Sequence, residues 1–426
     1  MAAPPPAHSY YEATALRPDF APPPDGDVRT DVCIVGGGLT GVSAALELAG
    51  RGFDVRLVDA GRIGGGASAR NGGQINTGLA PGATGLLALL GRDDARRLFD
   101  LSEAAIDLID ERVLRHHIDC DLARGYIHAA EKPRQERAIA AEVECLARDF
   151  GINRLEWLDR GTITERVHSP RFIAGANDPR AGHIHTLDYC LGLARAAAHA
   201  GAMLHEGVAA TAVDAATGVV TTGQGSIRAD HVLVAANAYL DGLVPDIDAM
   251  ALPVGTWVMT TQPLSTETRA RLIPGNECVC DSNNVLDYFR FTADGRLLFG
   301  GGVSYRGMED GPRAAGLLQR RLAKTFPELA REPAVHVWGG KVSITRNRLP
   351  HIGRAGQKLY FAHGFSGHGV AVTGLAGKLV AEAMAGDASG FDVFASIPHS
   401  PFPGGPHLRQ PLVTLGRLWY RLLDLL

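Results

Sequence analysis

The segments Asp31-Val-Cys-Ile-Val35 and Gly36-Gly-Gly-Leu-Thr-Gly41 decide the fold. The first reads as a short apolar strand and the second as a glycine turn, and Val42 to Leu48 continue with the apolar spacing of a helix. A second strand, Asp54 to Val58, follows and ends in Asp59. A strand, a G-x-G-x-x-G turn, a helix, a second strand and an acid within about 30 residues form the βαβ unit that binds dinucleotides. The sequence therefore predicts a Rossmann-like α/β domain near its start.

Each part of this unit has a physical role. Gly36 allows the tight turn, Gly38 lets the backbone approach the pyrophosphate, and Gly41 lets the helix pack closely on the strand. The free N–H groups and the positive dipole end of the helix N-terminus favour phosphates. Asp59 is placed to accept hydrogen bonds from ribose hydroxyls. The alternative, a glycine turn that binds nothing, explains neither the second strand nor the acid.

The composition is that of an ordinary globular protein of two or three domains. The chain has 426 residues, of which 46% are hydrophobic and 21% charged, and its formal net charge is -4. A slightly negative net charge does not provide the excess of basic residues that binds a phosphate backbone, so nucleic acid is not an expected partner. Glycine is the unusual residue, with 52 of 426 positions. Residues 31–85 hold 15 glycines and residues 339–377 hold 9, whereas residues 86–194 hold 7.

The second glycine-rich stretch repeats the pattern of the first. Leu359 to Ala362 read as a strand, His363-Gly-Phe-Ser-Gly-His-Gly369 as a turn, and Val370 to Ala383 as a helix. A second helix N-terminus behind small residues is another site that favours an anion. The two stretches together fit one long cofactor that reaches both, whereas a nicotinamide dinucleotide held by one βαβ unit does not need the second.

The rest of the chain reads as alternating helices and strands. Helical spacing is found at 92–115, 135–150, 187–200 and 314–329, and strand-like patterns at 201–208, 211–222, 231–235, 253–261 and 296–302.

The cysteines and the two ends of the sequence indicate in which cellular compartment we expect the protein. The six cysteines, Cys33, Cys120, Cys145, Cys190, Cys278 and Cys280, lack zinc-ligand spacing, so the sequence predicts reduced thiols and no metal site. With no signal peptide pattern and no run of 18 apolar residues, we expect a cytoplasmic protein without a membrane span. The tail from Leu412 to Leu426 has the apolar spacing of an amphipathic helix. It favours docking on its own protein, and the alternatives are a partner protein, a second copy of the chain in a homo-oligomer, or a membrane surface.

Several segments resemble a known family. These are the first glycine turn with Asp59, the loop Gly66-Ala-Ser-Ala-Arg-Asn-Gly-Gly-Gln74, the strand end Val234-Ala-Ala-Asn-Ala-Tyr239 and the turn Gly364-Phe-Ser-Gly-His-Gly369. They resemble the FAD-dependent amine and amino-acid oxidases, the superfamily of glycine oxidase, sarcosine oxidase and D-amino-acid oxidase.

A closer resemblance is to the γ-glutamylputrescine oxidases. It rests on segments spread along the chain: Ser9-Tyr-Tyr-Glu-Ala-Thr14, Ala69 to Gln74, Leu252-Pro-Val-Gly255, Thr261-Gln-Pro-Leu264, Ile344 to Gly353 and Phe402-Pro-Gly-Gly405.

The resemblance implies a discontinuous FAD-binding domain with an inserted substrate domain. The FAD-binding domain takes residues 30–95, 190–250 and 335–390. The substrate domain takes residues 96–189 and 251–334 and has an antiparallel sheet flanked by helices, an α+β unit. Residues 1–29 form an N-terminal arm and residues 391–426 a C-terminal tail with the amphipathic helix.

The resemblance also implies FAD contacts along both glycine-rich stretches. We expect noncovalent FAD, because Ser343 and Thr345 stand where sarcosine-oxidase relatives carry a flavin-linking cysteine. For the loop at 68–72 the alternative is a surface turn, and for Val208 it is a core valine. The expected contacts are Gly36, Gly38, Leu39, Thr40, Gly41, Asp59, Ala60, Arg62, Ser68, Arg70, Asn71, Gly72, Gly73, Gln74, Val208, Ala235, Ala236, Gly339, Gly364, Ser366, Gly367, His368, Gly369 and Val370.

The substrate site is inferred from the chemistry of amine oxidation. The carbon next to the nitrogen loses a hydride, so the site has to be dry, and a base is optional. His351, His363, His368 and Lys341 are the titratable groups near the expected flavin, each either a base or a structural donor. Trp257, Tyr288 and Trp338 are expected as aromatic walls of the substrate pocket, or as core residues.

One position departs from the amino-acid oxidases. Their carboxylate-binding arginine falls on Val342 here, which argues for an amine substrate rather than a plain α-amino acid. Lys341 or Arg346 is then available for a distal anion such as a γ-glutamyl carboxylate.

The expected function is FAD-dependent oxidation of a primary or secondary amine, with a γ-glutamylputrescine-like substrate. Hydride transfer to flavin N5 gives an imine, water hydrolyses the imine to an aldehyde, and O2 is reduced to H2O2. The alternatives are a dehydrogenase that passes electrons to a quinone or a protein, and a flavin-binding subunit of a larger complex.

Overall fold

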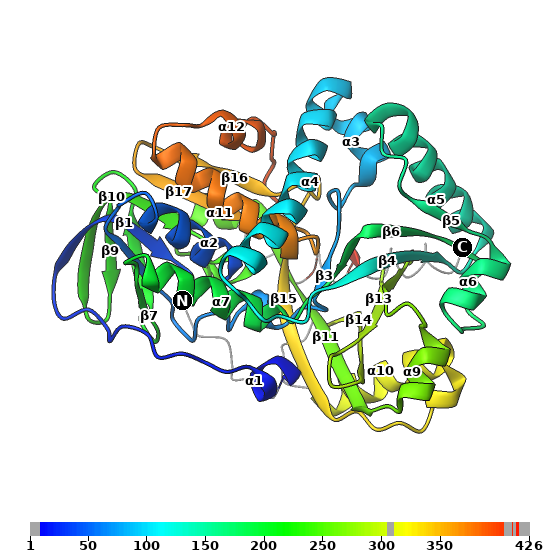
Figure 1. Cartoon of the computed structure of the whole chain (residues 1–426). Helices are drawn as coiled ribbons and strands as arrows, with labels where there is room; N and C mark the ends of the chain where they lie inside the picture. The colour runs from blue at the N-terminus through cyan, green and yellow to red at the C-terminus, as the bar shows by residue number, and fades with distance from the viewer. Residues whose placement is uncertain (1–8, 305–310, 404–410, 412–414, 417–426) are drawn as a thin grey trace.

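The structure is a computed structural model that describes residues 9–304, 311–403, 411 and 415–416. Two sheets organise it, and helices pack on both (Figure 1). One is an 8-stranded sheet whose centre is parallel, and the other is a 9-stranded, mostly antiparallel sheet. The fold is the expected α/β fold with a second, α+β part.

The first sheet contains the predicted βαβ unit. Its order is β16 (His351–Ala355), β17 (Leu359–His363), β10 (Gly225–Val234), β1 (Val28–Val35), β2 (Val55–Val58) and β7 (Met203–His205). In addition, β9 (Val219–Thr222) pairs with β10, and β8 (Ala210–Asp214) pairs with β9. The strands from β17 to β7 run parallel, and β16 and β9 pair antiparallel with their neighbours. Helices α2 (Leu39–Ala49), α4 (Arg92–Arg115), α7 (Thr186–His199) and α11 (Val370–Met384) pack together beside it.

Strand β1 lies at the centre of this sheet because its side chains are apolar on both faces. Val32 and Ile34 belong to one hydrophobic cluster, and Cys33 and Val35 belong to another on the opposite face. All four side chains are fully buried. A strand that is apolar on both faces is stable only where both faces are covered.

The parallel strands bring the predicted motifs to one edge. β1 ends before the Gly36–Gly41 turn, β2 before Asp59, β10 before Ala235 and β17 before the turn at Gly364. The carboxyl ends of parallel strands lie at the same edge of a sheet, which is where ligands of such sheets bind.

The second sheet forms the other half of the molecule. Its order is β15 (His336–Thr345), β11 (Ala251–Pro263), β14 (Arg296–Ser304), β13 (Asp287–Phe291), β12 (Cys278–Asp281), β4 (Ala123–Ala130), β6 (Ala174–His183) and β3 (Gln74–Ile75), with β5 (Glu156–Leu158) paired to β6. Among the described strands of this sheet, only β4 and β12 pair in parallel. The helices of this half are α3 (Gly82–Leu90), α5 (Pro133–Cys145), α6 (Arg160–Arg166), α9 (Thr266–Leu272) and α10 (Gly311–Thr325), and a π-helical turn, Leu146–Phe150, extends α5.

Strand pairing shifts two of the expected domain assignments. Residues 336–345, expected in the FAD-binding domain, form β15, which pairs with β11 along its length. Helix α4, expected mostly in the substrate domain, packs on α11 beside the first sheet. A strand shows its residue pattern locally, but its partner strand is chosen by hydrogen bonding that sequence spacing does not reveal.

The N-terminal arm contributes to the core. Helix α1 (Tyr10–Thr14) is capped by the Ser9 hydroxyl, which accepts the Glu12 N–H at 3.1 Å. Tyr10 and Tyr11 are buried. The Tyr11 ring lies edge-on to the His185 ring, and the two ring centres are 4.8 Å apart. The remaining short helices are η1 (Ala67–Ala69), η3 (Asn237–Tyr239), α8 (Pro245–Asp248), η4 (Pro327–Leu329) and α12 (Ser389–Ala395).

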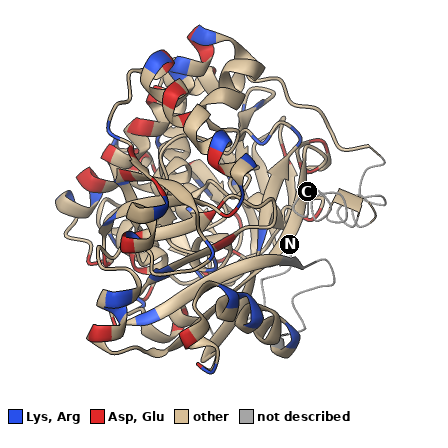
Figure 2. Cartoon of the chain, turned by 90° about the vertical axis from the view of Figure 1, so that its right-hand side faces the viewer, with Lys and Arg blue, Asp and Glu red and all other residues tan. Residues whose placement is uncertain are grey.

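The amphipathic helix expected at Leu412–Leu426 lies almost wholly outside the described residues. None of the helices in the described ranges has the length and apolarity needed to cross a membrane. Acidic and basic residues are interspersed over most of the side shown in Figure 2.

Candidate active site

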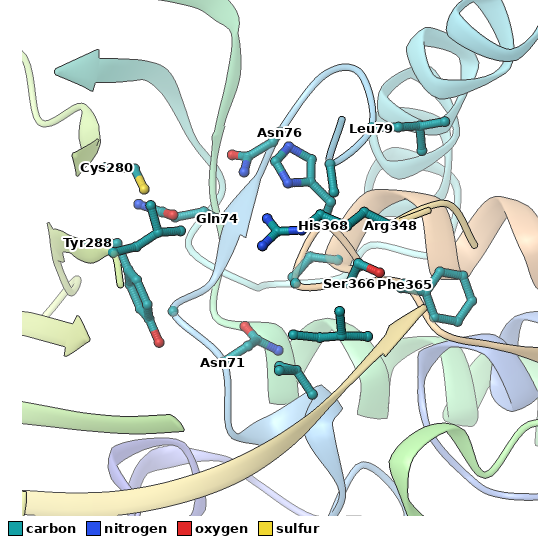
Figure 3. Close-up of a pocket in the computed structure, with 18 of the residues that line it drawn as sticks. Asn71, Gln74, Asn76, Leu79, Cys280, Tyr288, Arg348, Phe365, Ser366 and His368 are labelled. Carbon is teal, nitrogen blue, oxygen red and sulfur yellow. The ribbon is translucent and has the colours of Figure 1, made fainter. Parts of the chain in front are cut away.

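A cavity of about 910 Å³ lies along the carboxyl edge of the first sheet and reaches the second sheet. It brings together residues that are far apart in the sequence, as the close-up in Figure 3 shows. The expected site residues that line it are Gly36, Gly38, Leu39, Thr40, Asp59, Ala60, Ser68, Arg70, Asn71, Gly72, Gln74, Ala235, Ala236, Tyr288, Lys341, Ser366, Gly367, His368, Gly369 and Val370.

The first glycine turn is tightly packed. A Cβ at Gly36, whose φ is +115°, would lie 2.7 Å from the Ala235 carbonyl oxygen. A Cβ at Gly41 would lie 1.9 Å from the Gly36 carbonyl oxygen. Helix α2 has no side-chain cap at Gly38, and no acceptor in the described chain takes the Thr40 and Gly41 N–H groups. Free donors at the positive end of a helix fit a pyrophosphate.

Asp59 lies beside this turn. One carboxylate oxygen accepts the Gly37 N–H and the other accepts the Gly61 N–H, both at 2.7 Å. Burial raises the pKa of Asp59. The carboxylate lines the cavity next to the helix N-terminus, where it fits the ribose of an adenosine half.

The loop after Asp59 is fixed by its own side chains. The Ser68 hydroxyl accepts the Leu39 N–H at 2.9 Å, and the Asn71 amide donates to the Ala67 carbonyl at 2.9 Å. The Arg70 guanidinium donates to the Gly65 and Gly339 carbonyls at 2.9 and 3.0 Å. The loop is therefore tied both to helix α2 and to strand β15, and it is not a surface turn.

Arg290 supports the same loop from the second sheet. Its guanidinium is buried and donates to the Gly72 carbonyl at 2.8 Å, the Ile184 carbonyl at 3.0 Å and the Tyr11 hydroxyl at 3.1 Å. No carboxylate of the described chain forms an ion pair with it. The guanidinium thus holds the cavity loop, helix α1 and strand β13 in one network.

The second glycine turn forms the other end of the site. The Ser366 N–H donates to the Ser343 carbonyl at 2.9 Å, and the Gly364 N–H donates to the Asn237 side chain at 3.1 Å. Helix α11 begins after Gly369 with no side-chain cap. Its positive end therefore faces the cavity, where it can stabilise negative charge on a reduced flavin.

The structure separates the catalytic candidates. His368 lines the cavity, and burial together with the nearby His128 lowers its pKa to about 4. Lys341 also lines the cavity, and its ammonium lies 5.5 Å from the centre of the Tyr239 ring. His363 is buried outside the lining, and its Nε2 lies 2.8 Å from Nδ1 of His351.

Other expected residues also lie outside the lining. Trp257 and Trp338 are buried in the hydrophobic clusters of the two halves, so they are core residues rather than pocket walls. Arg346 is exposed and donates to the Pro401 carbonyl at 3.4 Å. The Val208 N–H donates to the Asp59 carbonyl at 2.8 Å. The remaining expected contacts outside the lining are Gly41, Arg62, Gly73, Gly339 and Gly364.

His128 and Ser282 are cavity residues that sequence reasoning missed. The Ser282 hydroxyl donates to the Ala129 carbonyl at 2.9 Å, so its oxygen accepts from His128 Nε2, also at 2.9 Å. This arrangement leaves His128 Nδ1 as an acceptor in the neutral ring. Burial lowers the pKa of His128 to about 4, which keeps the ring neutral at pH 7. The pairing of β4 with β12, which places the two residues together, has no local signal in the sequence.

A charged cluster adjoins the cavity at Asp281, which lines it. The Arg171 guanidinium lies 2.5 Å from Glu131 and 2.9 Å from both Asp281 and Asp287. Burial and the neighbouring Asp287 raise the pKa of Asp281 to about 7. Because the carboxylates share this arginine, the cluster has a structural role in holding β12 and β13.

Arg348 is a further cavity residue that sequence reasoning missed. It follows β15 with a left-handed φ of 60°, and it lines the cavity near Ser366 and His368. Figure 3 shows its side chain pointing into the cavity in the direction of Gln74 and Asn76. The sequence shows two arginines in the segment Thr345-Arg-Asn-Arg348, but it does not show which of them faces the cavity.

Similarity to known proteins agrees with this geometry. A family model described as FAD dependent oxidoreductase matches residues 31–383. The chain is 42% identical to the gamma-glutamylputrescine oxidoreductase of Escherichia coli (strain K12), over 98% of both chains. It is 37% identical to the probable oxidoreductase OrdL of Rhizobium meliloti (strain 1021), again over 98% of both.

Among solved structures the chain resembles the glycine oxidase of Geobacillus kaustophilus. The TM-score is 0.73 at 25% identity, and the match covers 88% of this chain and 100% of that one. The two glycine turns, the acid between them and the family match over most of the length give one conclusion: the chain belongs to the family of FAD-dependent oxidoreductases and uses FAD as its cofactor.

Proposed function

We propose that the protein oxidises the primary amine of a γ-glutamylated diamine, with γ-glutamylputrescine as the substrate. The observation that carries the proposal is the 42% identity to a gamma-glutamylputrescine oxidoreductase over 98% of both chains. The cavity supports it, because it extends past the residues suited to the cofactor to the second sheet. Space beyond the cofactor is what a long substrate with two functional ends requires.

The bound FAD would accept the hydride from the carbon next to nitrogen and pass both electrons to O2, which with two protons becomes H2O2. The oxidised substrate is an imine, and water converts it to an aldehyde and ammonia. The nitrogen has to be uncharged before the hydride leaves, because an ammonium has no lone pair to form the C=N bond.

The chain's own residues supply the setting for this chemistry. His128 Nδ1 is a neutral acceptor that can take a hydrogen bond from the substrate nitrogen. His368, also neutral at pH 7, adds no positive charge that would repel an amine. Gly369 and Val370 present the N-terminus of α11 to the negative charge that accompanies reduction.

Anaerobic mixing of the FAD-loaded protein with γ-glutamylputrescine tests the proposal. The expected result is rapid loss of the visible flavin absorbance, and on admission of air its recovery with one H2O2 per substrate. Putrescine, glycine and D-alanine are the comparison compounds. Flavin that stays oxidised with γ-glutamylputrescine but is reduced by glycine would refute the substrate, and flavin that stays reduced in air would favour a dehydrogenase.

A further inference from the structure

We infer that Arg348 binds the carboxylate of the substrate and so determines that the enzyme prefers γ-glutamylated amines. The inference rests on the proposed function and names the residue that recognises the end of the substrate that does not react. γ-Glutamylputrescine carries an amine at one end and an α-amino acid group, with a carboxylate and an ammonium, at the other.

The loop between β15 and β16 fixes the direction of Arg348. The Arg348 N–H donates to the Thr345 carbonyl at 3.2 Å, and the Thr345 hydroxyl donates to the Leu349 carbonyl at 2.7 Å. The Asn347 amide donates to the Pro398 carbonyl at 3.0 Å. With its left-handed φ of 60°, Arg348 points into the cavity, whereas Arg346 lies on the exposed side of the same loop.

The neighbours of Arg348 suit a zwitterionic group. Figure 3 places it among Gln74, Asn76, Ser366 and His368, which are amides, a hydroxyl and an imidazole held neutral at pH 7. A guanidinium binds a carboxylate through two parallel hydrogen bonds, a geometry that a lysine does not reproduce. The buried Asn76 Oδ1 has no hydrogen-bond partner in the described chain, so an acceptor for a ligand N–H lies in the same lining.

The other cationic candidates fit this role less well. Arg346 lies outside the lining, and Arg134 lines it from an exposed position on α5. The Arg70 guanidinium donates to two backbone carbonyls. The Lys341 ammonium lies over the Tyr239 ring. Val342 lines the cavity without a charge. Position 342, where the amino-acid oxidases carry their carboxylate-binding arginine, has no charge here, and the guanidinium of Arg348 takes over that role from the loop that follows β15.

A pair of matched substrates tests the inference. 4-Aminobutanoyl-putrescine is γ-glutamylputrescine without the carboxylate, so only an interaction with that group distinguishes the two. For Arg348→Ala we expect kcat/KM to fall by about 10- to 100-fold with γ-glutamylputrescine, the range of a charge-assisted hydrogen bond. With the decarboxylated analogue we expect less than about a threefold change, and Arg348→Lys should be intermediate with γ-glutamylputrescine. Arg346→Ala, from the exposed side of the loop, is the matched control and should leave both values unchanged.

A ligand that does not react makes the test independent of turnover. γ-Glutamylbutylamine lacks the amine that is oxidised, and its binding can be followed through the flavin absorbance. We expect its Kd to rise by about 10- to 100-fold in Arg348→Ala at an unchanged FAD content. Equal losses with both substrates, an unchanged Kd, or loss of FAD from Arg348→Ala would overturn the inference. Failure of both substrates to reduce wild-type flavin would instead contradict the proposed function, and the Kd would still decide the role of Arg348.

Discussion

Arg290→Met should destabilise the protein and weaken FAD binding, although Arg290 does not line the cavity. Methionine is unbranched and apolar, so it fills much of the same space without donating hydrogen bonds. The Gly72 and Ile184 carbonyls and the Tyr11 hydroxyl then lose the donor that the guanidinium provides. A buried polar group left without a partner costs about 1–3 kcal/mol, so three give roughly 3–9 kcal/mol.

That sum is an upper bound, because the variant also removes a buried charge that is costly to desolvate. We therefore expect a loss of about 3–5 kcal/mol in the free energy of unfolding, the range for breaking a buried charged network. FAD binding should weaken as well, since Gly72 lines the cavity and its carbonyl is held by Arg290. Arg290→Lys, which keeps the charge and some donors, should lose less.

Urea unfolding followed by circular dichroism gives the free energy, and titration of the apoprotein with FAD gives the Kd. The exposed Arg346→Met is the control and should stay within about 0.5 kcal/mol of wild type. The reasoning is refuted if Arg290→Met unfolds at the wild-type urea concentration and binds FAD with an unchanged Kd. That outcome would mean that the loop carbonyls find other donors, such as water.

Three further outcomes can be checked. Gly41→Ala should abolish FAD retention, because its Cβ would lie 1.9 Å from a backbone oxygen, whereas Gly223→Ala, with no atom within 4 Å of the added Cβ, should purify with full flavin. Acid precipitation should release all FAD into the supernatant from wild type and from Cys280→Ser alike, because burial raises the pKa of this cavity thiol and so keeps it protonated and unreactive toward the flavin. Flavin left in the pellet would contradict the expected noncovalent binding. The pKa of His128 is lowered to about 4 on folding, so as the pH falls below ~6.5 the unfolded chain binds the proton first and stability decreases. The Tm should therefore drop between pH 7 and pH 5, with a shallower slope in His128→Asn, and an identical slope in both proteins would show that this ring does not contribute.

Sequence patterns were sufficient where function depends on neighbouring residues. The turn from Gly36 to Gly41 and the turn before α11 each combine a strand, small residues and a helix in one continuous segment. Both appear in the structure at the expected positions, at the edge of the sheet where parallel strands end. A ligand-binding turn of this kind is local, so its spacing predicts it.

Patterns were insufficient where tertiary pairing or side-chain direction decides. The large apolar side chain of Trp338 predicts that the residue is buried, but not whether it lines the pocket or packs in the core. The structure places it in the core. His363 was expected as the first residue of the second turn, yet it ends β17 and faces His351 on β16. The inward direction of Arg348 depends on a left-handed φ that no residue type at that position announces.

The way the chain passes between the two sheets has a consequence for building chimeras. Strands of the second sheet occupy only two continuous stretches, residues 74–183 and 251–345. Exchanging these two stretches with a relative of the family would transplant that whole sheet while the first sheet stays intact. Arg348 lies just beyond the second exchange point, so such a hybrid would receive new pocket walls but keep the host's guanidinium. The pocket walls and the guanidinium of Arg348 therefore come from two different segments of the chain. A chimera designed to change the substrate preference needs its second exchange point after Pro350.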